Sequence, residues 1–393
     1  MTHIHLLTTR HRIASPQYGI LLELETILAS CADVQLVCPL ARQVYRRSTT
    51  ASPLVRTITQ KTLRRSIGLF HPIPEVDLPP AKGDVNVLLI LGLNGSDLEA
   101  LAAIPRWRRR YDLVVAYLFD CWVVEALPRI AAQIDHLFIP FPEMQAVLEA
   151  RLGLPVSLLP FGADVLGQGS ARLDRPVDVI SYGRNPLAYH QTLVTSFGQP
   201  GSNRLYYTHP TAQTEVFPTL PYGPERFDYQ HRLLLGKMLR RSKAALAFSN
   251  TYTAQVPSTV TPHVAHRVPV PILGYRWFEI SATGCAVIGK RPKSPLLAEY
   301  LGWEDATIEL PDDPRLGVDF IGNLLGDTDR MAAIHQRNYR ENLIRNDWRH
   351  RLRMMFERLA LPLPPRLKNQ LGEIERRYAA AQMPGTADSG LPE

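Results

Sequence analysis

The residues whose types and spacing best suit chemistry lie between Arg276 and Gly284. The segment has the pattern of a short helix, a glycine that stops it, and a buried strand, with Glu279 near the helix start. A carboxylate accepts two hydrogen bonds at once, so Glu279 suits the paired hydroxyls of a ribose, and Arg276, one turn earlier, suits a phosphate. Gly284 stands where a left-handed residue ends a helix. The simpler alternative is a glutamate favoured by the helix dipole and a solvated arginine.

This segment resembles the C-terminal domain of group 1 glycosyltransferases with the GT-B fold. The family pattern matches Arg276, Phe278, Glu279, Ala282, Gly284 and Ala286–Ile288. In that family the glutamate binds the ribose of a nucleotide-sugar donor, which implies the same role for Glu279, with Arg276 and Gly284 beside the donor. The family usually has a second acidic residue upstream in the same loop, and this sequence has none between His263 and Tyr275.

The resemblance continues, in order, from about residue 178 to residue 359. The run ending in Gly183 and Arg184 is similar to the first strand and loop of the donor domain, where the glycine admits a close backbone approach and the arginine meets the diphosphate. An ordinary turn with an exposed arginine is an equal alternative. A later run, similar to the segment ending at the donor pocket, implies nucleotide contacts for Ser249 and Asn250. Lys243 in that run either contacts the donor or is simply solvated.

The segment Asn346–Arg351 resembles the helix that closes this domain in the family, and we interpret it as architectural. Asp327-Thr-Asp329 superficially matches the metal-binding Asp-x-Asp of another glycosyltransferase fold. It lies in a Gly-Asp turn before a helix, so helix capping explains it better.

The N-terminal half resembles the family only in pattern. It carries two further candidates beside strands, Tyr18-Gly19 and Asp120, and a third candidate, His209, follows a strand of the second half. Tyr18-Gly19 opens a helix after the first strand, where a glycine admits the donor phosphates or the acceptor; the alternative is a helix N-cap. Asp120 ends a buried strand and suits a general base or a contact to an acceptor hydroxyl; the simpler alternative is that it caps the next helix. His209 is a similar candidate, and its alternative is a surface histidine.

The elements expected to position these residues alternate between strands and helices. In the first half, six apolar runs are continuous rather than alternating, which is typical of strands buried on both faces of a parallel sheet. A helical apolar stripe over Tyr18–Ala29 separates the first two, giving the pattern of a doubly wound fold. The six runs are Ile4–Thr8, Val34–Cys38, Val85–Leu91, Leu113–Phe119, His136–Phe141 and Val156–Phe161.

The alternation restarts after a linker near Ala163–Pro176 that is rich in Gly, Gln, Ser and Pro. We therefore predict two Rossmann-like parallel-sheet domains facing across a cleft, with ligands at the carboxyl ends of the strands. The predicted parts are an acceptor domain (1–165), a donor domain (176–360), a C-terminal helix (361–382) and a disordered tail (383–393). The later strands are Val177–Ser181, Leu205–Thr208, Ala244–Ser249, Cys285–Gly289 and Thr307–Leu310, and helical stripes cover Arg226–Arg240, Trp348–Leu359 and Arg366–Ala381.

Composition narrows the class of protein. The 393 residues are 45% hydrophobic and 21% charged, as in a packed globular protein, and the net charge of +7 suits anionic partners without choosing among them. The N-terminus lacks a signal-peptide pattern and no apolar run approaches the ~20 residues that span a bilayer, so we expect a cytoplasmic protein, with peripheral membrane contact left open. Phosphate-loop, nucleophile-elbow, zinc-protease and dinucleotide-loop motifs are absent from the sequence.

Together these features predict a glycosyltransferase that moves a sugar from a nucleotide-diphosphate donor to a glycan, lipid or small molecule. The resemblance implies retention of configuration, and a GT-B enzyme needs neither a cofactor nor a bound metal because cations and helix N-termini hold the diphosphate. One alternative is a GT-B-like binding protein without activity. Another is a nucleic-acid-binding protein using the basic clusters, although these are scattered and lack interleaved aromatics, so no nucleic acid is expected. The clusters are Arg106–Arg110, Arg240–Arg241 and Arg349–Arg353.

Overall fold

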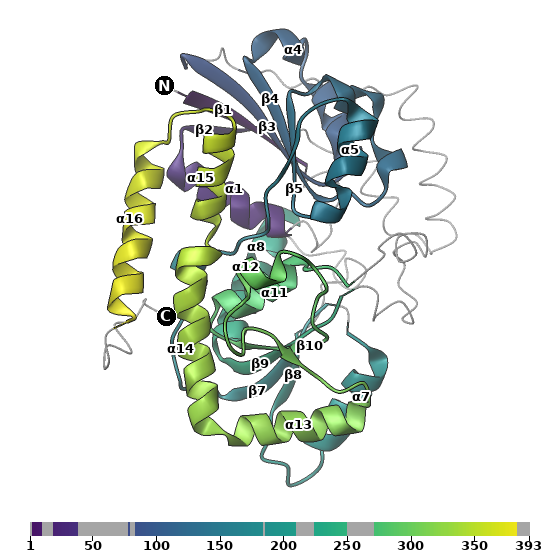
Figure 1. Ribbon diagram of the computed structural model, residues 1–393, viewed down its shortest axis with the longest axis vertical. Helices are drawn as coiled ribbons and strands as arrows, with labels where there is room; N and C mark the ends of the chain where they lie inside the picture. The colour runs from purple at the N-terminus through teal and green to yellow at the C-terminus, as the bar shows by residue number, and fades with distance from the viewer. Residues whose placement is uncertain are drawn as a thin grey trace. The chain divides into compact units, whose positions relative to one another are not determined.

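The structure is a computed structural model that describes residues 2–9, 19–37, 78, 83–183, 185–209, 224–249 and 271–382 (Figure 1). The chain divides into two compact units. Unit 1 comprises Met1–Leu159, Ala212–Arg232 and Phe356–Leu367, and unit 2 comprises Pro160–Thr211, Leu233–Met355 and Lys368–Glu393. The division differs from the expected boundaries because two later segments belong to the N-terminal unit.

Unit 1 contains a six-stranded sheet in the order β2-β1-β3-β4-β5-β6, with every neighbouring pair parallel. All six predicted strands are confirmed, with ends shifted by at most a few residues. The middles of β1, β3 and β4 are buried, as expected for strands covered on both faces, whereas β2 at the edge of the sheet is partly exposed. The strands are β1 (Thr2–Thr8), β2 (Val34–Val37), β3 (Val85–Asn94), β4 (Leu113–Asp120), β5 (His136–Ile139) and β6 (Val156–Leu158).

Among the described helices that lie wholly in unit 1, all but the first are short. The predicted helix after the first strand is confirmed as α1 (Gly19–Cys31), whose expected apolar stripe is buried. The remaining helical segments are η3 (Gly95–Ala103), α4 (Trp107–Arg110), η4 (Val124–Ala126), η5 (Arg129–Gln133), η6 (Pro142–Met144) and α5 (Gln145–Leu152).

Unit 2 contains a second parallel sheet, of five strands in the order β11-β10-β9-β7-β8. The five strands predicted in the second half are confirmed. They are β7 (Val177–Ser181), β8 (Tyr206–Thr208), β9 (Ser242–Ala247), β10 (Ala286–Gly289) and β11 (Ile308–Glu309).

The helices that contribute to unit 2 include three that helical apolar stripes in the sequence predict. The predicted ones are α8 (Pro224–Arg240), α15 (Trp348–Arg358) and α16 (Pro365–Ala380), each of which contributes residues to both units. Asp327 caps the helix that begins directly after it, at Thr328. It accepts a hydrogen bond from the Arg330 amide at 3.1 Å, so the capping interpretation is confirmed. Two further predicted helices are confirmed: α11 (Tyr275–Ala282), the short helix before Gly284, and α14 (Thr328–Arg345), the helix after Asp327. The remaining described helices of unit 2, which the sequence analysis does not predict, are α6 (Val165–Gln168), α7 (Leu187–Phe197), α12 (Leu297–Tyr300) and α13 (Pro314–Gly326).

Helix α14 packs through a buried polar face. His335 donates from Nδ1 to the Gly284 carbonyl at 2.8 Å, Asn338 donates to the Cys285 carbonyl at 2.9 Å, and Asn342 donates to Ser281 Oγ at 2.7 Å. The contacts repeat at helical spacing and hold the end of α11 and the start of β10. Because buried polar groups need such partners, this face fixes α11 in one position.

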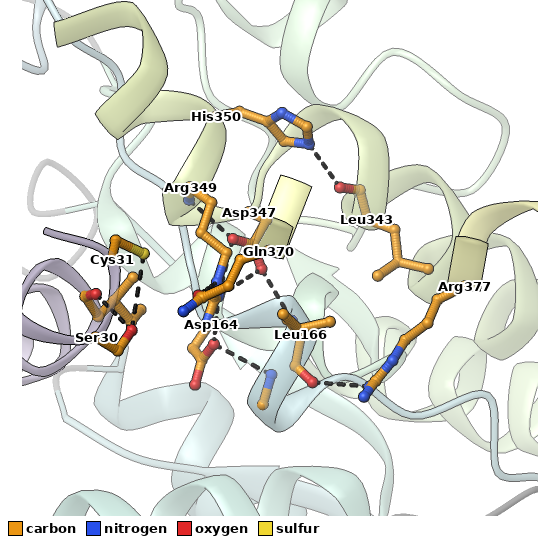
Figure 2. Close-up of polar contacts among 12 residues, drawn as sticks. Ser30, Cys31, Asp164, Leu166, Leu343, Asp347, Arg349, His350, Gln370 and Arg377 are labelled. Atoms are coloured by element: carbon orange, nitrogen blue, oxygen red, sulfur yellow. Dashed lines mark hydrogen bonds and ion pairs between the residues drawn. The ribbon is translucent and has the colours of Figure 1, made fainter. Parts of the chain in front are cut away.

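The segment predicted to be architectural is a buried ion network (Figure 2). Arg349 Nη1 lies 2.8 Å from Asp164 Oδ1 and 3.0 Å from Asp347 Oδ1, and Asp347 also accepts from the Leu166 amide at 2.9 Å. Burial lowers the pKa of Arg349, but the two carboxylates outweigh it and raise that pKa overall. Burial also raises the pKa of Asp164. The network ties the linker after β6 to the start of α15, in agreement with the predicted role.

Candidate functional site

The sheet of unit 2 has a topological switch point between β7 and β9. From β7 the chain passes to β8 on one side and then to β9 on the other. In doubly wound sheets, ligands bind beyond the carboxyl ends of the strands at such a point. Here β7 ends at Ser181 and is followed by Tyr182 and Gly183, whereas β9 ends at Ala247 and is followed closely by Ser249. These residues therefore mark the candidate site.

Tyr182 joins the two residues on which the sequence-based prediction depends. Its hydroxyl donates a hydrogen bond to Glu279 Oε2 at 2.8 Å, with both side chains buried. The guanidinium carbon of Arg276 lies 5.1 Å from the centre of the Tyr182 ring, within the range of a cation–π contact. The structure thus brings Arg276 and Glu279 together at the carboxyl end of β7.

Helix α11, which carries this pair, begins at Tyr275 after an N-cap at Gly274. Glu279 is its fifth residue and no residue of the first turn is acidic, so the expectation that Glu279 lies near the helix start needs correction. The influence of the dipole is confined to the first turn. A dipole-stabilised glutamate therefore does not explain Glu279, and the buried bond to Tyr182 does.

A glycine is needed at position 183 because of both the backbone conformation and the neighbouring side chain of Arg276. Its φ is +62°, in the left-handed region, and a Cβ at this position would lie 2.4 Å from an Arg276 guanidinium nitrogen. Any side chain at position 183 would displace Arg276, so this glycine also leaves the space that the guanidinium occupies. Arg184, predicted to meet a diphosphate, lies outside the described residues.

The site combines one cation and one carboxylate. Burial lowers the pKa of Arg276, whereas Tyr182 and Glu279 act in the opposite direction. A guanidinium remains charged at neutral pH even so. The site therefore presents a half-buried cation and a buried carboxylate on adjacent turns of one helix, which suits a phosphate beside a pair of hydroxyls.

Two further predicted residues lie at the same edge of the sheet. His209 follows β8, its amide donates to the Ser181 carbonyl at 2.8 Å, and its side chain is only 2% exposed. The alternative of a surface histidine is therefore wrong. Ser249 is also buried, two residues beyond β9. Asn250 lies outside the described residues.

The structure does not bring Lys243 and Gly284 to this edge. Lys243 is the second residue of β9, and its Nζ lies 2.7 Å from Asp178 Oδ1 at the amino end of β7. Gly284 precedes β10, and its φ of +78° confirms the predicted end of the helix. A Cβ on Gly284 would lie 2.1 Å from the Ser170 carbonyl oxygen. The observed contacts of Lys243 and Gly284 are structural.

Sequence reasoning missed Tyr182 and Lys290. Tyr182 directly precedes Gly183 in the sequence, but a tyrosine after a strand is usually part of the core. Lys290 follows β10 at the carboxyl edge, is buried, and its Nζ lies 2.5 Å from Asp312 Oδ1. The signal for both was a polar side chain directly after a buried strand.

In unit 1, Asp120 is the exposed last residue of β4, opposite Asn94 of β3. The N-cap of the next helical segment, η4, is Val123, and it makes no side-chain cap. The interpretation of Asp120 as a cap is therefore wrong, and its role toward an acceptor stays a prediction.

Gly19 is the buried first residue of α1, and Tyr18 lies outside the described residues. A Cβ on Gly19 would lie 2.6 Å from Arg232 Cδ, and Arg232 pairs with Glu23 at 2.8 Å. The space that this glycine leaves is therefore occupied by an arginine from α8.

Across the described ranges, no helix is both long and apolar enough to cross a bilayer. Within those same ranges, His, Cys, Asp and Glu side chains do not gather in threes in a way that could hold a metal ion.

No protein-family model matches this chain, and neither does any curated protein. Solved structures do match. An alpha-glucosyltransferase in complex with UDP and a 13-mer DNA containing a central A:G mismatch superposes with a TM-score of 0.52 and 13% identity, covering 91% of this chain and 99% of that one. The complex of an alpha-glucosyltransferase with UDP-glucose and DNA containing an abasic site gives 0.51 and 12%, covering 92% and 100%. Anabaena Alr3699/HepE in complex with UDP gives 0.48 and 10%, covering 91% and 99%.

The likenesses to the two alpha-glucosyltransferase structures support the fold. The chain has two Rossmann-like parallel-sheet domains of the GT-B class with a helical C-terminal part, as predicted from the sequence.

Proposed function

We propose that this chain is a glycosyltransferase that binds the nucleotide-sugar donor in unit 2. The observation that carries the proposal is the contact of Tyr182 with both Glu279 and Arg276 beyond the carboxyl end of β7. This contact lies at the switch point of the sheet, where doubly wound folds bind nucleotides. The carboxylate takes the ribose hydroxyls and the guanidinium takes the diphosphate.

Breaking a glycosidic bond leaves negative charge on the departing diphosphate. A fixed cation in a site of low dielectric stabilises this charge more than water does, because it needs no reorganisation when the bond breaks. Arg276 is such a cation, held over the ring of Tyr182 and half-buried. In this proposal Arg276 stabilises the leaving group, and no metal or cofactor takes part.

The likeness to glucosyltransferases bound to UDP or UDP-glucose supports uridine diphosphate sugars as the first donors to test. The family pattern around Glu279 supports retention of the anomeric configuration. The acceptor, a glycan, lipid or small molecule, binds in unit 1 in this proposal, with Asp120 at the end of β4 as its contact or base.

Calorimetric titration of the full chain with a panel of nucleotide sugars tests the assignment. A charge-assisted hydrogen bond contributes about 1.5–3 kcal/mol, so Glu279→Ala should weaken donor binding about tenfold to a hundredfold. Glu375→Ala, at an exposed glutamate of α16, is the matched control and should bind like the parent. Absence of binding to every donor, or equal binding by Glu279→Ala, would refute the proposal. Binding without hydrolysis or transfer would instead support the GT-B-like binding protein.

The basic clusters do not favour nucleic-acid binding as a second function. Arg349 and Arg351 are buried, the first in the ion network and the second donating to the Pro160 carbonyl at 3.1 Å. In the Arg106–Arg110 cluster, Arg108 pairs with Asp135 at 2.5 Å. Arginines engaged in this way contribute little to a phosphate-binding surface.

A further inference from the structure

In the proposed donor site, Tyr182 contacts Glu279 and Arg276 through different parts of its side chain. Its hydroxyl donates to one specific oxygen, Oε2 of Glu279, at 2.8 Å, with about nine-tenths of each side chain buried. A hydroxyl bonded to an ionised carboxylate forms one of the stronger hydrogen bonds in proteins. Since the terminal torsion of a glutamate is otherwise broad and two-fold, this bond selects one orientation of the carboxylate.

The ring of Tyr182 makes a separate contact. Arg276 lies over it, and Gly183 leaves the space that the guanidinium occupies. The hydroxyl and the ring of one residue thus act on different partners, the hydroxyl on Glu279 and the ring on Arg276. Substitutions that remove only the hydroxyl, or the hydroxyl and the ring, separate the two effects.

We propose that Tyr182 is a positioning residue that sets the preference of the donor site for ribonucleotides over 2′-deoxyribonucleotides. The inference rests on the proposed function, because it assigns the ribose contact to Glu279. A carboxylate held in one plane accepts from both vicinal hydroxyls at once without losing torsional freedom on binding, and the Tyr182 hydroxyl holds it so. A ligand without the 2′-hydroxyl keeps only one of these two bonds, so the Tyr182 hydroxyl adds more to ribonucleotide affinity than to deoxyribonucleotide affinity.

The test is calorimetric titration of the full chain with UDP, GDP and ADP, with the 2′-deoxy form of each, and with the corresponding monophosphates. In the parent protein, the nucleotide that binds should bind more tightly than its deoxy form. Tyr182→Phe should reduce that preference about fivefold, the equivalent of one hydrogen bond. The preference for diphosphate over monophosphate should stay within about twofold, since the ring under Arg276 remains. Tyr182→Leu, which also removes the ring, should reduce both preferences.

Tyr117→Phe is the matched control. The Tyr117 hydroxyl is buried in unit 1 and donates to the Leu159 carbonyl at 2.9 Å, so this variant also loses one buried hydrogen bond. It should lower the melting temperature about as much as Tyr182→Phe does, without changing either preference. A purely structural role of Tyr182 would weaken ribonucleotides and deoxyribonucleotides equally.

The outcomes separate the inference from the proposed function. An unchanged preference for ribonucleotides in Tyr182→Phe, while Glu279→Ala still abolishes that preference, overturns the role of Tyr182 alone. Binding that is insensitive to Glu279→Ala, or no binding to any of the three diphosphates, overturns the proposed donor site and the inference with it. A selective loss of the ribonucleotide preference in Tyr182→Phe supports both.

Discussion

Gly284→Ala should destabilise unit 2 without changing its nucleotide contacts. Gly284 ends α11 with φ +78°, and an added Cβ would lie 2.1 Å from the Ser170 carbonyl oxygen, where an ordinary contact is about 3.5 Å. The backbone at Ser170 would have to move. That carbonyl is also an acceptor for Arg175, which is almost fully buried and donates to it and to the Thr283 carbonyl, each at 3.0 Å.

The cost of this substitution has two parts. Alanine in the left-handed region costs about 1–2 kcal/mol. Disturbing a buried hydrogen bond costs about 1–3 kcal/mol, and alanine recovers about 0.4–1 kcal/mol by restricting the unfolded chain. The sum is about 3 kcal/mol. For a domain of this size, each kcal/mol lowers the melting temperature by about 2–4 °C, so Gly284→Ala should melt about 6–12 °C below the parent.

Differential scanning calorimetry of the full chain measures this shift, and Gly322→Ala is its control. Gly322 lies inside α13, with an ordinary φ and nothing within 4 Å of an added Cβ. Alanine should therefore stabilise the helix by about 0.5–1 kcal/mol and raise the melting temperature. If Gly284→Ala melts with the parent, or if Gly322→Ala falls as far, the account of Gly284 is wrong. At temperatures where Gly284→Ala is folded, it should bind nucleotide like the parent.

Three further substitutions test other parts of the structure. Burial lowers the pKa of His335 to about 3 from 6.5, so the contribution of His335 to stability is present above pH ~6.5 and is lost as the pH falls toward 3. Between pH 7 and 5, the free energy of unfolding measured in urea should therefore fall about 2 kcal/mol more for the parent than for His335→Gln. Parallel losses in the two proteins would refute this. Gly183→Ala and Gly153→Ala both place alanine at positive φ, but only at Gly183 does the new Cβ meet a side chain. Both variants should lose about 1 kcal/mol of stability, yet only Gly183→Ala should weaken UDP binding. Equal UDP binding by the two variants would contradict the assignment of the donor site to Arg276 and Glu279. Arg349→Met leaves two buried carboxylates without their cation and should cost about 3–5 kcal/mol in chemical denaturation, whereas Arg376→Met at an exposed pair should cost under about 1 kcal/mol; similar costs would contradict the ion network.

The strands could be predicted because buried parallel strands leave continuous apolar runs in the sequence. The capping pattern at Asp327 predicts where helix α14 begins, but its length could not be predicted in the same way. Its buried face carries His335, Asn338 and Asn342, and a polar buried face hides the apolar period by which helices are recognised. The need for these polar residues arises from backbone groups of α11 and β10, which are distant in sequence.

The candidate site was predictable only in part. The types and spacing of Arg276 and Glu279 indicated the right helix, but Lys243 fell at the wrong end of its strand. The predicted strand Ala244–Ser249 already places Lys243 at the amino end, so only the family resemblance indicated a donor contact for it. Tyr182 acts through a partner 97 residues away, which the local pattern does not reveal.

The most direct test of the central claim is a crystal structure of the full chain soaked with a nucleotide-sugar donor, UDP-glucose first. The account predicts nucleotide density beyond the carboxyl end of β7, with ribose hydroxyls within hydrogen-bonding distance of Glu279 and the diphosphate beside Arg276. A nucleotide bound in another part of unit 2 or in unit 1, with Glu279 and Arg276 uncontacted, would contradict it.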